Sequence, residues 1–150
     1  MDLQSLEFSL ETARQMLPRL MAGWVIDLGL SLEAVDRGGT AGRADRVPGV
    51  VMRMAFSERI CRHGGIVCGQ AITALADTAT SLAVGAAAGQ FLPIVTVDQT
   101  THFLAAASCD LLADARVVRH GRTMIFVRAE ICRATDRKPV AMVSSAFAVG

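Results

Sequence analysis

The sequence predicts an α+β fold in which a curved antiparallel sheet wraps around one long buried helix. The stretch from residue 64 to residue 97 contains a single charged side chain, Asp77, and is long and apolar enough to form a helix buried inside the protein. Two strand-like runs precede this stretch and four follow it. Strands grouped in this way, rather than alternating with helices, are typical of α+β proteins.

The other expected elements follow from local patterns. Residues 3–21 carry apolar side chains at helical spacing and predict an amphipathic helix with Pro18 as its stop signal. Residues 29–35 and 50–56 predict strands, joined by a loop over residues 36–49 that is rich in Gly, Arg and Asp. Residues 93–104, 110–120, 123–134 and 139–149 predict four more strands with tight turns. We expect one domain over residues 1–150, with a helical N-terminal extension over about residues 1–22.

Composition narrows the possible partners. The chain is 52% hydrophobic and 19% charged, which is more apolar than an average domain and indicates burial in an oligomer interface. A net charge of +1 argues against a nucleic-acid partner. Polar residues interrupt the long apolar helix, so we expect no membrane span.

The four cysteines form no CxxC pair and follow no secretory segment, so we expect reduced thiols and a cytoplasmic location. Cys61, His63 and Cys68 are close in sequence, but a zinc site needs a fourth ligand and regular spacing. We therefore expect no metal.

Asp77 belongs to a polar stripe on the predicted helix. If that helix begins near Gly69, about 100° of rotation per residue places its polar side chains in one narrow band. The members of this band are Gln70, Thr73, Asp77, Thr80 and Ser81. An unpaired buried charge costs several kcal/mol, so Asp77 should face a cavity, water or a partner subunit.

Two roles for Asp77 remain open at this point. It is either a structural carboxylate that accepts backbone N–H bonds or a catalytic one. A catalytic carboxylate would be served by the glycine-rich turn before the helix, because a helix N-terminus offers free N–H donors to an oxygen that develops negative charge.

Four segments resemble the PaaI-type thioesterases, hotdog-fold enzymes that cleave acyl-coenzyme A: "GGIVCGQAITALADTA", "VTVDQTTHFLAAA", "HGRTMIFVRAEI" and "PVAMVSSAF". The resemblance covers roughly residues 48–149. It implies a hotdog fold, an acyl-CoA substrate and no cofactor beyond the coenzyme A of that substrate. It also implies a homodimer with two active sites in the shared seam, and a tetramer built as a dimer of dimers.

Two positions, His63 and Cys68, could correspond to the first residue of a motif that the family carries before its catalytic aspartate. In the family, an "HGG" motif begins nine residues before the catalytic aspartate, whereas His63 lies fourteen residues before Asp77. Counting back nine residues reaches Cys68, so "CGQ" takes the place of "HGG". A helix fixes the rise and rotation per residue, and we therefore give the spacing to Asp77 more weight than the identity of residues 63–65 with the "HGG" motif.

On this register, the resemblance implies a role for each matching residue. Asp77 would be the general base or the nucleophile, and Thr96 would help to place the attacking water. Gly69 would hold the thioester carbonyl of a site completed by Asp77 of the other subunit. The substrate-binding candidates are Arg62, Cys68, Gln70, Phe103, Arg119 and Arg122, of which the arginines could meet the phosphates of coenzyme A.

Two departures keep other functions open. Arg62 stands where the family often has Asn, and Cys68 replaces the histidine of the motif. One alternative is therefore a hotdog protein that binds acyl-CoA without turnover. Another is a hotdog hydratase or dehydratase, which would use a histidine, His63 or His102, together with the carboxylate.

Overall fold

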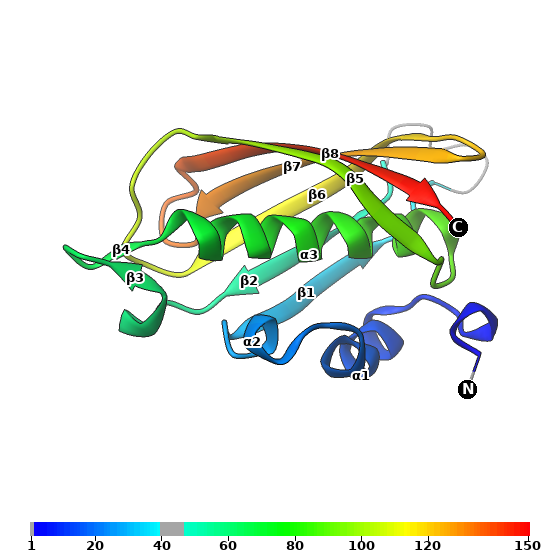
Figure 1. Ribbon diagram of the computed structural model, residues 1–150, viewed down its shortest axis with the longest axis horizontal. Coiled ribbons are helices and arrows are strands. Elements are labelled where there is room, and N and C mark those ends of the chain that lie inside the picture. Colours follow the sequence, from blue (N-terminus) through cyan, green and yellow to red (C-terminus); the bar gives the residue numbers. More distant parts are fainter. Residues whose placement is uncertain (1, 40–46) are drawn as a thin grey trace.

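One long helix lies against one six-stranded sheet in the computed structural model, which describes residues 2–39 and 47–150 (Figure 1). The helices are α1 (Leu10–Leu20), α2 (Gly23–Ile26) and α3 (Gly69–Ala88), with short 3-10 turns at Leu3–Ser5 and Glu58–Ile60. The sheet contains β1 (Leu30–Asp36), β2 (Gly49–Met54), β5 (Ile94–Phe103), β6 (Leu111–His120), β7 (Met124–Arg133) and β8 (Pro139–Val149). A separate two-stranded hairpin consists of β3 (Cys61–Arg62) and β4 (Ile66–Val67).

The strand order of the large sheet is β1-β2-β6-β7-β8-β5, and every neighbouring pair is antiparallel. The sheet curves around α3, which contacts all six strands (Figure 1). Alternate residues of β6 and β7 face the helix and are buried: Leu111, Ala113, Ala115, Val117, Ile125, Val127, Ala129 and Ile131. This arrangement confirms the predicted α+β fold.

Helix α3 fills the concave side of the sheet. Leu75, Ala76, Ala79 and Ala83 of this helix have no exposed surface, and its small alanines allow the strands to approach closely. The helix ends at Gly89, whose φ of 75° is a left-handed conformation favoured by glycine. Among the described residues, α3 is the one helix long and apolar enough to cross a membrane, yet most of it is buried against the sheet.

The N-terminal extension differs from the prediction. A single helix over residues 3–21 is wrong, because α1 begins only at Leu10, after a capping box formed by Ser9 and Thr12. Phe8, immediately before this cap, is fully buried against α3. Pro18 was expected to end the helix, but it lies inside α1, which continues to Leu20.

The two segments before α3 were predicted less completely. Asp36 and Gly49 pair where β1 ends and β2 begins, so the two strands form a hairpin, as the predicted loop over residues 36–49 implies. Residues 40–46 of this loop lie outside the described part of the chain. The β3–β4 hairpin and α2 were not predicted. Gly64 and Gly65 make the turn of that small hairpin with φ angles of 91° and 71°.

Candidate functional site

An open groove of about 710 Å³ runs between one side of α3 and the edge strand β5. Of the residues that the sequence predicted for the site, this groove brings together Gly69, Gln70, Asp77, Thr96 and Phe103. Trp24, Thr73, Ala74 and Gln99 complete its lining. The groove therefore contains a carboxylate, two hydroxyls, two amides and the N-terminus of a long helix.

Asp77 lies half-buried in this groove, in the third turn of α3. The Thr96 hydroxyl of β5 donates a hydrogen bond of 3.3 Å to its Oδ1. Burial raises the pKa of Asp77 above its usual value because desolvation disfavours the charged carboxylate, and the hydrogen bond from Thr96 lowers this pKa by a smaller amount. A carboxylate whose proton affinity is raised in this way is better suited to accept a proton from water than an exposed one.

A β-bulge in β5 decides which side chains reach the groove. The pairing of β5 with β8 shifts between Thr96 and Asp98, so Gln99 points to the same side as Thr96 and Asp98 points to the opposite side. The Gln99 side-chain amide donates to the Thr73 carbonyl oxygen at 3.2 Å, and Ser145 donates to the Gln99 Oε1 at 3.4 Å. These two hydrogen bonds connect Gln99 of β5 to α3 and to β8.

The helix N-terminus supplies hydrogen-bond donors at the far end of the groove. Helix α3 begins at Gly69, and the N–H groups of a first helical turn have no partner within the helix. The Phe103 ring covers Gly69 so closely that a Cβ at this position would lie 3.2 Å from a ring atom. Glycine at position 69 therefore leaves the backbone N–H groups at the start of α3 accessible, although the Phe103 ring lies close by.

Four other candidates do not line the groove of the same protomer. Cys68 is the residue before the first turn of α3, and its N–H donates to the Ile60 carbonyl oxygen. Arg62 is exposed in β3, where its guanidinium donates to the carbonyl oxygen of His63 at 3.5 Å. Arg119 and Arg122 are exposed at the β6–β7 turn, which Figure 1 shows beyond the end of the sheet that is remote from the start of α3.

The polar stripe of α3 reaches the groove only in part. Gln70, Thr73 and Asp77 line it, whereas Thr80 is fully buried and donates its hydroxyl hydrogen to the Ala76 carbonyl oxygen at 2.8 Å. Ser81 lies in a second cavity beyond Asp77.

His63, Gly64 and Gly65 form the exposed turn between β3 and β4 and lie outside α3. The "HGG" sequence at residues 63–65 therefore forms a hairpin turn in this protein. Within the described residues, no group of three or more His, Cys, Asp or Glu side chains comes together in a way that could hold a metal ion.

Besides Ala74, the groove residues that sequence patterns did not reveal are Gln99 and Trp24. Strict alternation along β5 would place Asp98, and not Gln99, beside Thr96, because it takes no account of the bulge. Trp24 reaches the groove from α2, more than forty residues before Gly69, and remains 61% exposed. Its status as the single tryptophan of the chain was the one available signal.

Several solved structures share this fold, and some of them are named as thioesterases. A thioesterase from Haemophilus influenzae superimposes with a TM-score of 0.79 at 21% identity, covering 99% of this chain and 95% of that one. The Escherichia coli PaaI protein from the phenylacetic acid degradation operon gives 0.75 at 20% identity, with 99% and 96% covered. Zebrafish thioesterase superfamily member 2 gives 0.76 at 23% identity, with 95% and 99% covered.

These similarities show that the chain has the hotdog fold. A search of curated proteins by sequence found no match. The sequence model of the thioesterase superfamily matches residues 64–140, which include α3, β5, β6 and β7 and therefore most of the groove. Because this match spans half of the chain, the protein belongs to the thioesterase superfamily.

Proposed function

We propose that this protein hydrolyses acyl-coenzyme A thioesters to a free acid and coenzyme A. One observation carries the proposal: Asp77, the single charged residue of the core helix, lies half-buried in an open groove and is hydrogen-bonded to Thr96. Burying a carboxylate on a core helix costs free energy, so its presence there is better explained by a function than by a contribution to stability. Superfamily membership identifies thioesters as the substrates to test first.

In the proposed reaction, Asp77 takes a proton from a water molecule as the water oxygen attacks the thioester carbonyl carbon. Thr96 donates its hydrogen to Asp77, so its oxygen remains free to accept a hydrogen bond from that water. The carbonyl oxygen becomes an oxyanion, which an N–H group at the start of α3 stabilises. The C–S bond then breaks, and the proton passes to the thiolate of coenzyme A. Attack by Asp77 itself, followed by hydrolysis of the anhydride, is the other route open to the same residues.

Helical geometry supports a site shared by two subunits. Gly69 and Asp77 are eight residues apart on one helix, which separates them by about 12 Å along its axis. They cannot both contact one carbonyl group from the same chain. We therefore propose a homodimer in which Asp77 of one protomer faces Gly69 of its partner.

The edge strand β5 is the surface that we propose for this dimer. It forms one edge of the sheet, and its Val95 and Val97 side chains are 66% and 59% exposed. Antiparallel pairing of two β5 strands would continue the sheet and place the two grooves head to tail. For a dimer of dimers, the outer face of the sheet is available, where Val118, Phe126 and Met142 are exposed.

The hydratase alternative gains no support within one protomer. His63 lies in the β3–β4 turn, His102 contributes to a hollow on the outer face of the sheet, and His120 is exposed at the end of β6. None of the three lines the groove that contains Asp77. The binding-only alternative is left to experiment.

The test is a panel of short, medium, long and aryl acyl-CoA thioesters, with free thiol as the readout. Asp77→Asn should lower turnover by roughly 10²–10⁴, the usual contribution of a positioned base. The matched control is Asp98→Asn, which neutralises a carboxylate on the opposite side of β5. Fluorescence of Trp24, which lines the groove, reports substrate binding independently of turnover.

Loss of turnover in Asp77→Asn with retained binding and folding supports the proposal. Near-native turnover of this variant would remove Asp77 from the mechanism. Saturable quenching of Trp24 without thiol release from any thioester would favour the binding-only protein.

The same substitution has an expected effect on stability. Because burial raises the pKa of Asp77, its charge is disfavoured in the folded state, and Asp77→Asn should not lower the unfolding temperature at neutral pH.

A further inference from the structure

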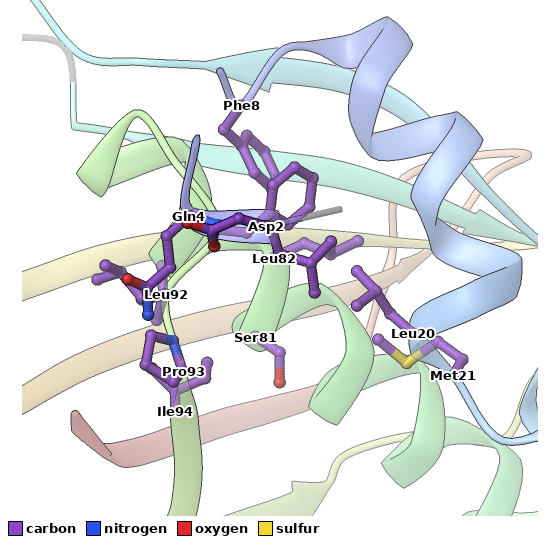
Figure 2. A pocket seen from close by; sticks show the side chains of 14 residues that line it. Asp2, Gln4, Phe8, Leu20, Met21, Ser81, Leu82, Leu92, Pro93 and Ile94 are labelled. Atoms are coloured by element: carbon purple, nitrogen blue, oxygen red, sulfur yellow. The ribbon is translucent and has the colours of Figure 1, made fainter. Parts of the chain in front are cut away.

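A second cavity, of about 550 Å³, lies beside the C-terminal half of α3 (Figure 2). Such a volume is sufficient for a small organic ligand. Apolar side chains from four parts of the chain form most of its wall: the N-terminal segment, the end of α1, α3 and the start of β5. They include Leu3, Phe8, Leu20, Met21, Leu82, Val84, Phe91, Leu92, Pro93 and Ile94.

The cavity lies one helical turn beyond the part of α3 that lines the groove around Asp77. Ser81, on its wall, is one helical turn beyond Asp77, so about 6 Å of helix axis separates the two residues. On the opposite side, Ile94 lines the cavity and Thr96 lines the groove. These two residues alternate along β5 and point to the same face of the sheet. The same two elements, α3 and β5, therefore contribute to the walls of both the groove and the cavity.

The N-terminal segment is held firmly enough to serve as a wall. The Phe8 N–H donates to the Gly89 carbonyl oxygen at 2.9 Å, and the Phe8 ring lies 4.9 Å from the Phe91 ring centroid. Gly85 allows this contact, because a Cβ there would overlap the Phe8 ring. Glu7 pairs with Arg37 at 2.6 Å on the outside. Figure 2 shows Phe8 and Leu82 on one side of the cavity and Leu92 on another.

The lining indicates what the cavity could accept. Among its lining residues, which all belong to the described part of the chain, Asp2 is the one charged side chain, and it already accepts the Gln4 N–H at 3.0 Å. No lining residue carries a positive charge. A neutral hydrocarbon chain would be buried there favourably, whereas a chain that ends in a carboxylate would lose its hydration without gaining a partner.

We propose that this cavity holds the hydrocarbon part of the acyl group, so that the preferred substrates are unbranched alkanoyl-CoA thioesters of medium length. This inference rests on the proposed function of the groove. From Asp77, the helix rises about 6 Å to Ser81 and about 12 Å to Gly85. An extended alkyl chain with bonds of about 1.5 Å advances about 1.25 Å per carbon, so these lengths correspond to acyl groups of roughly six to eleven carbons.

The experiment measures kcat/KM for a series from acetyl-CoA to dodecanoyl-CoA, in the wild-type protein and in two variants that fill the cavity from different elements. These variants are Ser81→Leu on α3 and Leu92→Trp just before β5. Burial of each methylene group should raise kcat/KM roughly fourfold until the cavity is full. The variants should lower kcat/KM for decanoyl-CoA at least about tenfold and leave acetyl-CoA within about twofold.

Ser57→Leu is the matched control, because Ser57 is exposed and lies outside both cavities. Thermal unfolding checks that each variant is folded. If one of the two cavity-filling variants does not fold, the other one carries the test. A decanoyl-CoA analogue that ends in a carboxylate should be hydrolysed at least about tenfold more slowly than decanoyl-CoA.

Two kinds of failure are distinguishable. A flat dependence on chain length, unchanged by both filling variants, would overturn the acyl cavity and leave the thioesterase proposal intact. Absence of hydrolysis for every thioester would overturn the thioesterase proposal. In that case Trp24 fluorescence still tests the cavity: tighter binding of decanoyl-CoA than of butanoyl-CoA, weakened by Ser81→Leu, supports it, and equal binding overturns it.

Discussion

The Thr96 hydroxyl donates a hydrogen bond of 3.3 Å to the carboxylate of Asp77, and this contact joins the edge strand of the sheet to the core helix. Burial and this hydrogen bond have opposite effects on the pKa of Asp77. Burial raises the pKa of Asp77, while the hydrogen bond favours the ionised form and lowers it. The balance between them can be tested with a single substitution.

Thr96→Val should move the acidic limb of the pH profile of kcat/KM to higher pH. Valine keeps the shape of threonine but cannot donate to the carboxylate, so the pKa of Asp77 should rise further and more of the base should be protonated at a given pH. Thr96→Ser retains the hydroxyl and should leave the limb near its wild-type position. A limb that stays in place in Thr96→Val would mean that this hydrogen bond does not influence the group that limits activity.

Mixing two inactive variants should restore activity if each site is shared by two chains. Gly69→Val should block the approach of substrate to the start of α3, where a new side chain also meets Phe103. Asp77→Asn removes the proposed base. In a mixed dimer, one site combines the intact halves of the two chains and the other site carries both changes. If subunits are exchanged by mild denaturation and refolding and half of the dimers are mixed, activity should reach about a quarter of the wild-type value.

The two homodimers, treated in the same way, are the controls for the mixing experiment. Mass spectrometry should verify that mixed dimers are present. If they are present and remain inactive, the shared site is excluded.

His63→Ala should leave turnover within several-fold of wild type. His63 lies in the exposed turn between β3 and β4, and the helix with the candidate carboxylate begins only at Gly69. A motif reading of "HGG" would instead predict a loss of roughly 10²–10⁴, as for a catalytic acid or base. A loss of that size in a folded, dimeric protein would contradict the register proposed here and would favour the hydratase alternative.

Gly49→Ala should destabilise the fold by about 2–3 kcal/mol, because forced overlap inside a packed sheet costs this much. A Cβ at Gly49 would overlap the backbone carbonyl oxygen of Ala115 on β6, which cannot rotate away as a side chain could. Gly23→Ala is the control, since a Cβ at that position meets nothing within 4 Å. Urea unfolding of both variants measures the difference, and equal midpoints would contradict the expected overlap.

The core helix and the strands after it could be predicted because their patterns are local. The long apolar run around Asp77 predicted a helix that begins near Gly69, as α3 does, and alternation predicted β6 and β7. The N-terminal extension could not be predicted in the same way. Leu3 and Leu6 continue the helical spacing of α1, but the Ser9–Thr12 capping box and the burial of Phe8 interrupt it.

The groove itself depends on long-range contacts that no local pattern contains. Trp24 approaches from α2, and Gln99 enters because a bulge after Thr96 reverses the alternation of β5. The cavity beside Ser81 needs the N-terminal segment, α3 and β5 to meet. Helical spacing could identify the carboxylate, and the family resemblance could identify its hydroxyl neighbour, but neither could determine the walls around them.

The position of β5 in the sheet also has a consequence for the order in which the protein is assembled on the ribosome. Within the sheet, β5 pairs with β8 alone, yet β6 and β7 must be synthesised between them. While the chain emerges, β5 therefore has no strand to join, and Thr96 has no fixed place beside Asp77. Non-local strand pairing of this kind forms late. A nascent chain that already contains every proposed catalytic residue should thus remain inactive until its final strand is released.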